Sequence, residues 1–370
     1  MMKKIYTSVL LLFVMFGIAQ APTTQSINSI PVGYYNGAIG TGYTLKTNLY
    51  NKIHTHTELS YTPGLWNAYP TTDVRADGKV WDIYSGCNFV FGPVANGGNQ
   101  DNGTGGNQEC QLFNREHTFP KSWFDSAEPM YTDLFHVMPT DKKDNSARGN
   151  LAYGIAGAPI TLNTSNGSKI GNNITPNAPT GMTVFEPADE YKGDIARNYF
   201  YMATCYQNVI SGWLNNNPNG ALFLDGTSDK VYAQWSLDML YSWHIQDPVS
   251  DKEIARNNAV YGIQGNRNPF IDHPEYVQII WGAVLGVKNF DILATVSVYP
   301  NPSNDHRVNI QSDVVLDKIE LVNINGQIVQ QIKKPVSQNN TYTLENLPQG
   351  FYFIKLTSDN QTATKKVMVN

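Results

Sequence analysis

A glutamate and a histidine stand side by side in the stretch NREHTFP, as Glu116 and His117. A carboxylate is a good ligand for a hard divalent cation, and a neutral imidazole is a suitable general base near physiological pH. Taken alone, two adjacent polar side chains are more often an exposed pair than a site. Their meaning therefore depends on the residues that the rest of the chain places beside them.

A second group of polar residues lies in DLFHVMPTDKKDNSARGN, residues 133–150. The amide oxygen of Asn145 is a further hard ligand. Arg148 follows three residues later, on the same face of an expected helix. Its guanidinium would either brace a phosphate oxygen bidentately or form an ion pair with Glu116 or Asp144. The sequence leaves both interpretations open.

These residue types fit the hydrolysis of a phosphodiester bond. The reaction needs an activated water, charge to stabilise the phosphorane, and help for the leaving oxygen, and one divalent ion supplies the last two. Magnesium keeps several waters, so that one or two protein oxygens suffice to hold it. The residues predict a one-metal site with His117 as the base and Glu116 and Asn145 as ligands of Mg²⁺ or another divalent cation.

The local sequence also predicts the elements that carry these residues. Leu134 to Met138 is apolar and strand-like, and Pro139 is expected to end that strand. Thr140 is expected to cap a helix that stops at Gly149. We therefore expect strand, loop, strand and helix, with polar side chains converging from the first strand and the helix.

The adjacency of Glu116 and His117 sets a geometric condition. Neighbouring residues of a regular strand point to opposite faces. Both side chains can serve one phosphate only where the strand ends or bends, and Pro120 favours an early end.

Three stretches in order, NREHTFPKSWF, DLFHVMPTDKKDNSARGN and QGNRNPFIDHPEYVQIIWG, resemble the bacterial endonuclease I family. The resemblance runs from about Leu49 to Gly286. It implies an α+β nuclease domain with a ββα-metal core of the His-Me finger type, and a sequence-nonspecific, magnesium-dependent activity. On the matching positions it implies that His117 is the general base and that Glu116 and Asn145 are the metal ligands. It implies that Arg148 and Asn150 support the site.

One position departs from the family's pattern. Many members carry two histidines after the Asp-Leu pair, whereas this chain has Phe135 and His136. We expect His136 to support the site from behind or to point to the core. The other histidines of this region are interpreted as structural: His54, His56, His244 and His273.

The N-terminus predicts export. Lys3 and Lys4 precede the apolar run from Val9 to Ile18, and small residues follow it up to Ala21. This is the layout of a signal peptide, assigned to residues 1–21, and its apolar run is shorter than the roughly 20 residues that a membrane span needs. No other segment has the composition of a transmembrane helix.

The three cysteines are compatible with an oxidising compartment. Cys87 and Cys110 flank a loop rich in glycine and asparagine, which a disulfide between them would close. Cys205 lies in an apolar stretch and is expected to be buried. The spacing contains no CxxC pair, so that a zinc site built on cysteine is not expected.

The pattern changes from Ile292 onward to short strands of period two, with a hairpin signal at Asn325-Gly326. We expect a separate all-β, Ig-like sandwich over residues 292–370, following a nuclease domain over residues 22–290. Its elements YPNPS, NGQ, LPQGFYFIKL and KKVMVN resemble, in order, the type A C-terminal sorting domain of the type IX secretion system. The resemblance implies the secretion machinery as a partner and a secreted or cell-surface location.

The prediction is an exported endonuclease that acts on DNA, with RNA left open, and that is monomeric. The net charge of −5 counts mildly against a nucleic-acid partner, although a local basic groove can exist on an acidic body. A metallopeptidase is disfavoured because HExxH is absent. A non-enzymatic alternative is a surface adhesin, and the acidic net charge fits an adhesin better than it fits a nuclease.

Overall fold

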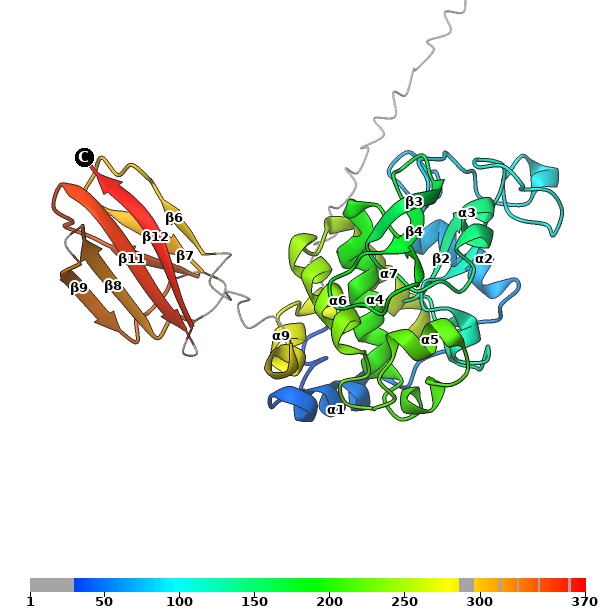
Figure 1. The fold of residues 1–370 in the computed structure, drawn as a ribbon, viewed down its shortest axis with the longest axis horizontal. Coiled ribbons are helices and arrows are strands. Elements are labelled where there is room, and N and C mark those ends of the chain that lie inside the picture. The colour runs from blue at the N-terminus through cyan, green and yellow to red at the C-terminus, as the bar shows by residue number, and fades with distance from the viewer. Residues whose placement is uncertain (1–29, 286–295, 313–314, 325, 339, 359–360) are drawn as a thin grey trace, which may run out of the picture. The chain divides into compact units, whose positions relative to one another are not determined.

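The computed structural model describes residues 30–285 and 296–370, apart from residues 313–314, 325, 339 and 359–360. The chain divides after Leu285 into two compact units (Figure 1). The predicted signal peptide, residues 1–21, lies outside the described residues. Within the described ranges, no helix is both long enough and apolar enough to span a membrane.

The first unit combines helices with small sheets, which confirms the α+β class. Its helices are α1 Gly42–Ile53, α2 Gly64–Thr72, α3 Lys142–Arg148, α4 Lys192–Cys205, α5 Pro218–Phe223, α6 Gln234–Gln246, α7 Asp251–Gln264, α8 Pro269–Asp272 and α9 Tyr276–Trp281. Its strands are β1 Phe113–His117, β2 Val137–Asp141, β3 Ala156–Asn163, β4 Lys169–Asn173 and β5 Thr183–Glu186.

Helix α4 forms the centre of this unit. Every side chain from Gly193 to Cys205 is buried, as expected of a helix that other elements cover all round. Helix α6 packs along it, and α1 and α8 also contact it. The neighbouring helix α7 begins with the predicted capping box, in which Ser250 and Glu253 each bond the other's backbone N–H.

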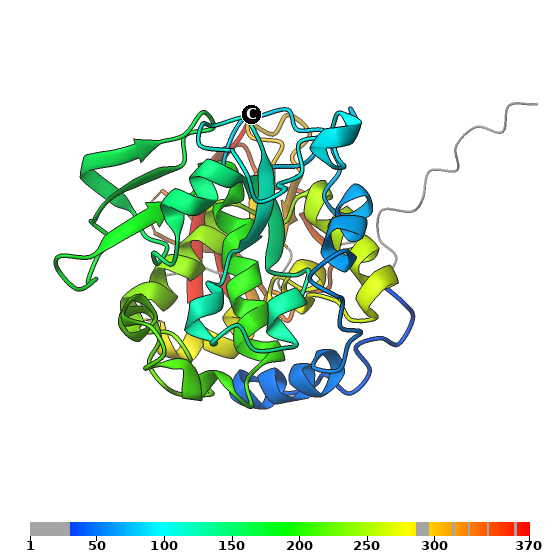
Figure 2. The same ribbon diagram turned by 90° about the vertical axis from the view of Figure 1, so that its right-hand side faces the viewer.

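Strands β1 and β2 pair antiparallel, and α3 follows β2 directly, which gives the predicted ββα arrangement. Glu116 lies opposite Met138, and His117, the last residue of β1, lies opposite Val137. Figure 2 shows the two strands, in teal, running through the unit beside the short helix α3. β1 therefore ends at His117, which is the condition under which both side chains can serve one phosphate.

The second strand differs from its prediction. It begins at Val137 instead of Leu134 and continues through Pro139, which pairs with Arg115. Proline is tolerated there because β2 pairs only with β1 among the described strands, so that one side of β2 needs no ladder hydrogen bond. The preceding residues are instead held in a turn, in which the backbone N–H of His136 donates to the carbonyl of Asp133.

The cap of α3 also differs from its prediction. Asp141, not Thr140, caps the helix, and its Oδ1 accepts from the backbone N–H groups of Lys143 and Asp144 at 2.8 and 3.1 Å. A carboxylate at this position satisfies two otherwise unpaired donors and interacts favourably with the helix dipole. The helix stops at Gly149, as predicted, with a φ of 55°.

A three-stranded antiparallel sheet, in the order β3-β4-β5, follows α3 in the chain. In Figure 2 it stands at one side of the unit, in green. The backbone N–H of Phe185 in β5 donates to the carbonyl of Ala152, and that of Gly154 donates to the carbonyl of Phe185. These bonds tie the segment after α3 to the sheet.

The second unit is the predicted β-sandwich. Its strands are β6 Ser297–Tyr299, β7 Val308–Gln311, β8 Lys318–Asn323, β9 Ile328–Lys333, β10 Thr341–Leu344, β11 Gly350–Ser358 and β12 Gln361–Val369. They form two antiparallel sheets, in the orders β10-β7-β6 and β12-β11-β8-β9. Alternate side chains of both sheets, such as Ile310 and Ile354, fill one core. The predicted hairpin joins β8 to β9, although Asn325 itself lies outside the described residues.

Candidate active site

A hollow of about 170 Å³ opens beside the end of β1 and the helix α3. Three of the residues that the sequence singled out line it: Glu116, His117 and Asn145. The hollow is completed by Tyr61, Asn114, Arg115, Pro120, Lys121 and Gly149. The ββα arrangement thus brings the adjacent Glu-His pair and the asparagine of α3 to one place.

Glu116 is buried, with 2% of its surface exposed, and one of its oxygens is held on two sides. Its Oε1 accepts from the hydroxyl of Tyr84 at 2.8 Å and from Arg148 at 2.6 Å. Its Oε2 makes no hydrogen bond within the part of the chain that the structure describes. Burial raises the pKa of Glu116 to about 7, against the opposing effects of Arg148 and Tyr84. The carboxylate is therefore fixed in place with one oxygen free.

Arg148 lies in the interior and does not line the hollow. Its Nη1 donates to Glu116 and to the carbonyl of His117 at 2.9 Å, and its Nη2 donates to the carbonyl of Thr118 at 2.8 Å. Of the two interpretations that the sequence left open, the structure contains the ion pair with Glu116. Arg148 therefore holds the end of β1 and the Glu116 carboxylate, and it does not face the space where a phosphate would bind.

Asn145 presents its oxygen rather than its nitrogen. Its Nδ2 donates to the carbonyl of Arg115 at 3.1 Å. Because this bond uses the amide nitrogen, Oδ1 is the atom left for a ligand in the hollow. The bond also links α3 to β1, so that the positions of Asn145 and Glu116 depend on each other.

His117 is held in a single tautomer. Its Nε2 lies 2.9 Å from the carbonyl of Tyr131, and since a carbonyl can only accept, Nε2 carries the hydrogen and Nδ1 carries the lone pair. The imidazole stacks on the ring of Tyr131 with 5.1 Å between centroids. Burial, followed by the nearby His136, holds the pKa of His117 well below its usual value of 6.5. His117 is consequently a neutral imidazole with a free lone pair, as a general base requires.

His136 lies beside His117 and is fully buried, with 5.6 Å between the centroids of the two rings. Its Nε2 donates to the carbonyl of Met130 at 2.6 Å, and it lowers the pKa of His117. Phe135, where many family members have a further histidine, is buried against Tyr201 at 4.6 Å between ring centroids. In this chain that position therefore belongs to the core.

Asn150, predicted to support the site, is exposed after the end of α3. Its Oδ1 accepts from Nδ2 of Asn219 at 2.9 Å. It does not line the hollow, and the contact that the structure gives it joins two surface segments.

The oxygens of the hollow fit a divalent cation. The hydrogen bonds of Glu116 and Asn145 use Oε1 and Nδ2, which leaves Oε2 and Oδ1 as hard ligand atoms for a metal ion. The two residues line the same space. A cation that keeps several of its waters, as Mg²⁺ does, needs no more protein ligands than these.

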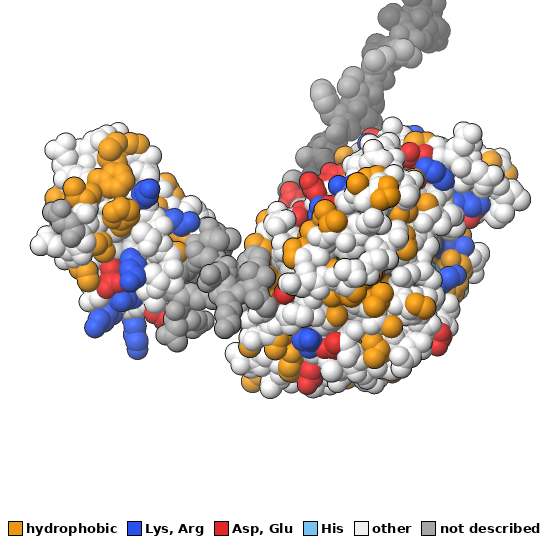
Figure 3. Space-filling view, in the orientation of Figure 1, with side chains coloured by type: hydrophobic (Ala, Val, Ile, Leu, Met, Phe, Trp, Pro, Cys, Tyr) orange, Lys and Arg blue, Asp and Glu red, His pale blue; other side chains and the backbone are white. Residues whose placement is uncertain are grey.

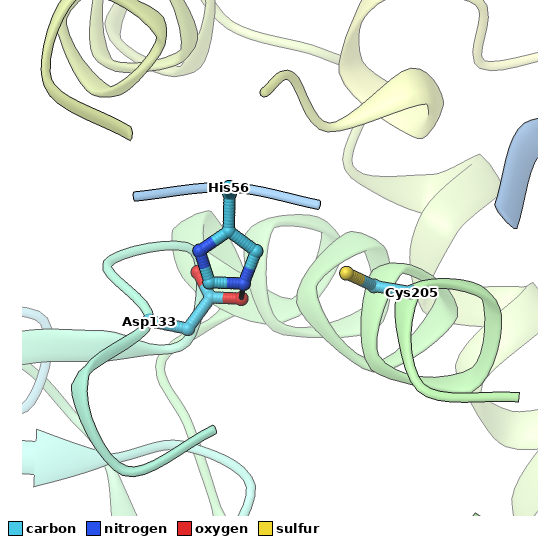
Figure 4. Close-up of side chains that lie close together, drawn as sticks. All are labelled: His56, Asp133 and Cys205. Carbon is cyan, nitrogen blue, oxygen red and sulfur yellow. Dashed lines mark ion pairs between the residues drawn. The ribbon is translucent and has the colours of Figure 1, made fainter. Parts of the chain in front are cut away.

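A second group of potential metal ligands, His56, Asp133 and Cys205, lies elsewhere in the nuclease unit (Figure 4). The Asp133 carboxylate is already saturated: Oδ2 accepts from the hydroxyls of Tyr201 and Tyr206, and Oδ1 accepts from the amides of Phe135 and Gln264. The ligand atoms of the three residues lie within 4.8 Å of one another, but the thiol of Cys205 donates to the carbonyl of Ile53. The group therefore forms part of the hydrogen-bond network that fixes the turn before β2.

The predicted disulfide is present between Cys87 and Cys110, and Cys205 is a free, buried thiol. The disulfide reaches the site through the cap of α3, because the backbone N–H of Cys110 donates to Oδ2 of Asp141 at 2.6 Å. The bridge therefore secures the segment that precedes β1 to the start of the helix that carries Asn145.

Sequence reasoning missed several residues that shape the site. Arg115 and Lys121 stand within and just after the stretch NREHTFP, so their charge was a visible signal. Tyr84 and Tyr131 carry no local signal, because they reach the site only through the fold. Tyr131 moreover acts through its backbone carbonyl, which any residue would supply.

The comparisons with known proteins identify the family of each unit. The model of the endonuclease I family matches residues 41–275. This chain belongs to the endonuclease I family. The model of the secretion system C-terminal sorting domain matches residues 297–370. The protein is thus a secreted or cell-surface nuclease with a type IX sorting tail, and its family implies a divalent metal.

Two of the relatives of this endonuclease I family member are named as extracellular ribonucleases. The extracellular ribonuclease of Bacillus subtilis (strain 168) is 36% identical over 254 residues, which cover 67% of this chain and 78% of that protein. The extracellular ribonuclease of Bacillus amyloliquefaciens is 34% identical over 255 residues, with the same coverage. Ulvan lyase NLR42 of Nonlabens ulvanivorans is 30% identical over 79 residues, which are 21% of this chain and 15% of that protein.

Proposed function

We propose that this nuclease is a sequence-nonspecific endonuclease that hydrolyses phosphodiester bonds of both DNA and RNA by a one-metal mechanism. The observation that carries the proposal is the shared hollow, which Glu116, His117 and Asn145 line together. A fixed carboxylate, a neutral imidazole and an amide oxygen are the groups that such a reaction needs from the protein.

In the proposed reaction His117 activates the water. Its Nδ1 takes a proton from the water, the water oxygen forms a bond to phosphorus, and the bond from phosphorus to the leaving sugar oxygen breaks. That oxygen takes up a proton from solvent, which gives a phosphate monoester and a sugar hydroxyl. The carbonyl of Tyr131 holds the Nε2–H and stabilises the imidazolium that forms.

Glu116 and Asn145 are proposed to hold the divalent ion, with Mg²⁺ as the expected species. When bound, the ion supplies positive charge for the phosphorane and for the leaving oxygen. The protein's part is to keep the two oxygens in place: Arg148 and Tyr84 fix Glu116, and the bond from Asn145 to the carbonyl of Arg115 fixes the amide.

The mechanism does not require a 2′-hydroxyl, because the nucleophile is water. DNA and RNA should therefore both be cleaved. The relatives named as extracellular ribonucleases support RNA as a substrate class. Attack by water also predicts RNA products without a 2′,3′-cyclic phosphate.

The test is digestion of supercoiled plasmid and of a single-stranded RNA by the mature full chain, with Mg²⁺ or with EDTA. We expect both substrates to be cut in Mg²⁺ and neither in EDTA. His117→Ala should abolish cleavage, whereas the matched variant His273→Ala, at a partly exposed histidine outside the hollow, should cut normally. An intact plasmid in Mg²⁺ would favour the adhesin alternative. Cyclic phosphate ends on the RNA would show that the 2′-hydroxyl attacks instead of water.

We also propose that the two domains have separate functions. Residues 22–290 form the nuclease domain, and residues 292–370 direct the chain to the type IX secretion machinery. The family matches support this division. The enzyme is further proposed to act as a monomer.

A further inference from the structure

A nuclease that binds a polyanion needs cationic groups at its site, and this chain carries a net charge of −5. Arg148, the cation that the sequence suggested for the phosphate, is buried and paired with Glu116. Two other basic residues line the hollow, Arg115 and Lys121. Figure 3 shows Lys and Arg side chains along the edge of the nuclease unit where α2 and α3 lie in Figure 1.

We propose that Arg115 and Lys121 form the phosphate-binding site of this nuclease, with Lys121 on the scissile phosphate and Arg115 on a neighbouring phosphate. The inference rests on the proposed hydrolysis in the same hollow. It identifies the residues that would supply the positive charge which Arg148 does not supply there.

The ion pairs of the nuclease unit single out these two residues. Within residues 30–285, most Lys and Arg side chains pair with a carboxylate, among them Arg197 with Glu253 and Arg256 with Asp73. The exceptions in that range are Lys46, Lys52, Lys79, Arg115 and Lys121. Two of these five line the hollow. Cations without a carboxylate partner beside a catalytic base are available to an anionic ligand.

Arg115 is held rigidly. Its guanidinium carbon lies 3.6 Å from the ring centroid of Tyr61 and 4.4 Å from that of Trp66. Its Nη1 donates to the carbonyl of Tyr61 at 2.7 Å and to the hydroxyl of Thr62 at 2.8 Å. Its Nη2 makes no hydrogen bond within the described residues, so that donors remain for a phosphate oxygen. A guanidinium fixed in this way loses little conformational freedom on binding, which suits a positioning contact.

Lys121 lies next to the base. It is exposed at the start of a short 3-10 helix, Lys121–Trp123, directly after Pro120. Its ammonium lies 5.6 Å from the ring centroid of Tyr131, the ring that stacks on His117. A flexible ammonium beside the attacking water can follow the charge that develops on the scissile phosphate.

The two roles predict different kinetic effects. Lys121→Gln should lower kcat about 100-fold, because it removes a cation from the developing charge. Arg115→Gln should raise KM about tenfold, with kcat changed less than about twofold. Each variant should reduce the slope of log KM against log salt by about one.

The experiment measures kcat and KM of the mature full chain on a labelled oligonucleotide over a range of salt concentrations. Lys79→Gln is the matched control, because Lys79 is a partly exposed cation that has no ion pair within residues 30–285 and lies outside the hollow. It should behave as wild type. If Arg115→Gln fails to fold, Arg115→Lys keeps the charge, and it should keep the salt slope while raising KM.

The proposal is overturned if Lys121→Gln retains the wild-type kcat and salt slope, as Lys79→Gln should. That result is distinct from a failure of the proposed function, in which wild type itself would not cut. An active wild type, an inactive His117→Ala and a Lys121→Gln variant with unchanged kinetics would together contradict the phosphate site alone.

Discussion

His117 and Glu116 are neighbours in the chain, and burial affects their protonation in opposite ways. Burial keeps His117 neutral, with its pKa well below 6.5, and burial raises the pKa of Glu116 to about 7. Each shift disfavours the charged form of the group. His117 is therefore neutral over the whole physiological range, whereas Glu116 becomes fully ionised only as the pH rises above about 7.

This difference predicts how metal binding depends on pH. A cation competes with the proton on Glu116, so that the apparent affinity for Mg²⁺ should fall about tenfold for each pH unit below 7 and level off above it. Titration calorimetry in buffers of different ionisation enthalpy should show close to one proton released per ion at pH 6. Glu116→Gln, which lacks one of the two proposed ligands, should lose most of the affinity at every pH and release no proton. An affinity that is constant from pH 6 to 8 would contradict the assignment of Glu116 as ligand.

The residue types of the site could be predicted from the sequence, but their partners could not. Glu116, His117 and Asn145 were predicted as site residues from type, spacing and resemblance, and the structure places all three around one hollow. For Arg148 the sequence could not decide between a phosphate and a carboxylate, because the choice depends on burial behind β1. Arg115 and Lys121 were visible as charges, but their freedom from ion pairs follows only from the packing of the whole unit.

At the level of elements, the site depends on the junction of β1, β2 and α3. Asp141 ends β2, caps α3 and accepts from the backbone of Cys110. The prediction that Pro139 ends the strand was wrong, because a two-stranded pair has a free side that needs no N–H. The shift moves the cap from Thr140 to Asp141, whereas Asn145 and Gly149 keep their expected places in the helix and at its end.

The disulfide next to this junction gives a prediction at the same scale. Cys87 and Cys110 are 23 residues apart, and closing a loop of that length is expected to stabilise the fold by about 3 kcal/mol. The double variant Cys87→Ser/Cys110→Ser should therefore have a free energy of unfolding about 3 kcal/mol lower in urea. Adding reductant should lower the stability of wild type but not that of the variant. A difference below about 1 kcal/mol would indicate that the loop is already ordered by its other contacts.

At the scale of the whole molecule, two units with separate cores follow each other in the chain. The sandwich buries side chains of its own two sheets, among them Leu321, Tyr342 and Val367. The sequence predicted this unit well because period-two alternation is a local signal. The nuclease unit was harder to predict, since its central helix α4 is buried on all sides and has no exposed face to mark its orientation.

The separate cores predict that the nuclease works without the tail. A mature chain that ends at residue 290 should keep the kcat and KM of the full chain, and its free energy of unfolding should change by less than about 1 kcal/mol. The truncated chain should no longer be exported by the type IX machinery, because the tail is proposed to direct that export. A truncated chain that is unfolded or inactive would show that the two units depend on each other.

The central claim is that Glu116 and Asn145 hold one ion beside His117. The most direct measurement is a crystal structure of the mature chain soaked in Mn²⁺, with anomalous data collected at the manganese edge. We predict one peak about 2.1 Å from Oε2 of Glu116 and from Oδ1 of Asn145, which is lost in Glu116→Gln. A peak at His56, Asp133 and Cys205, with none in the hollow, would contradict the account.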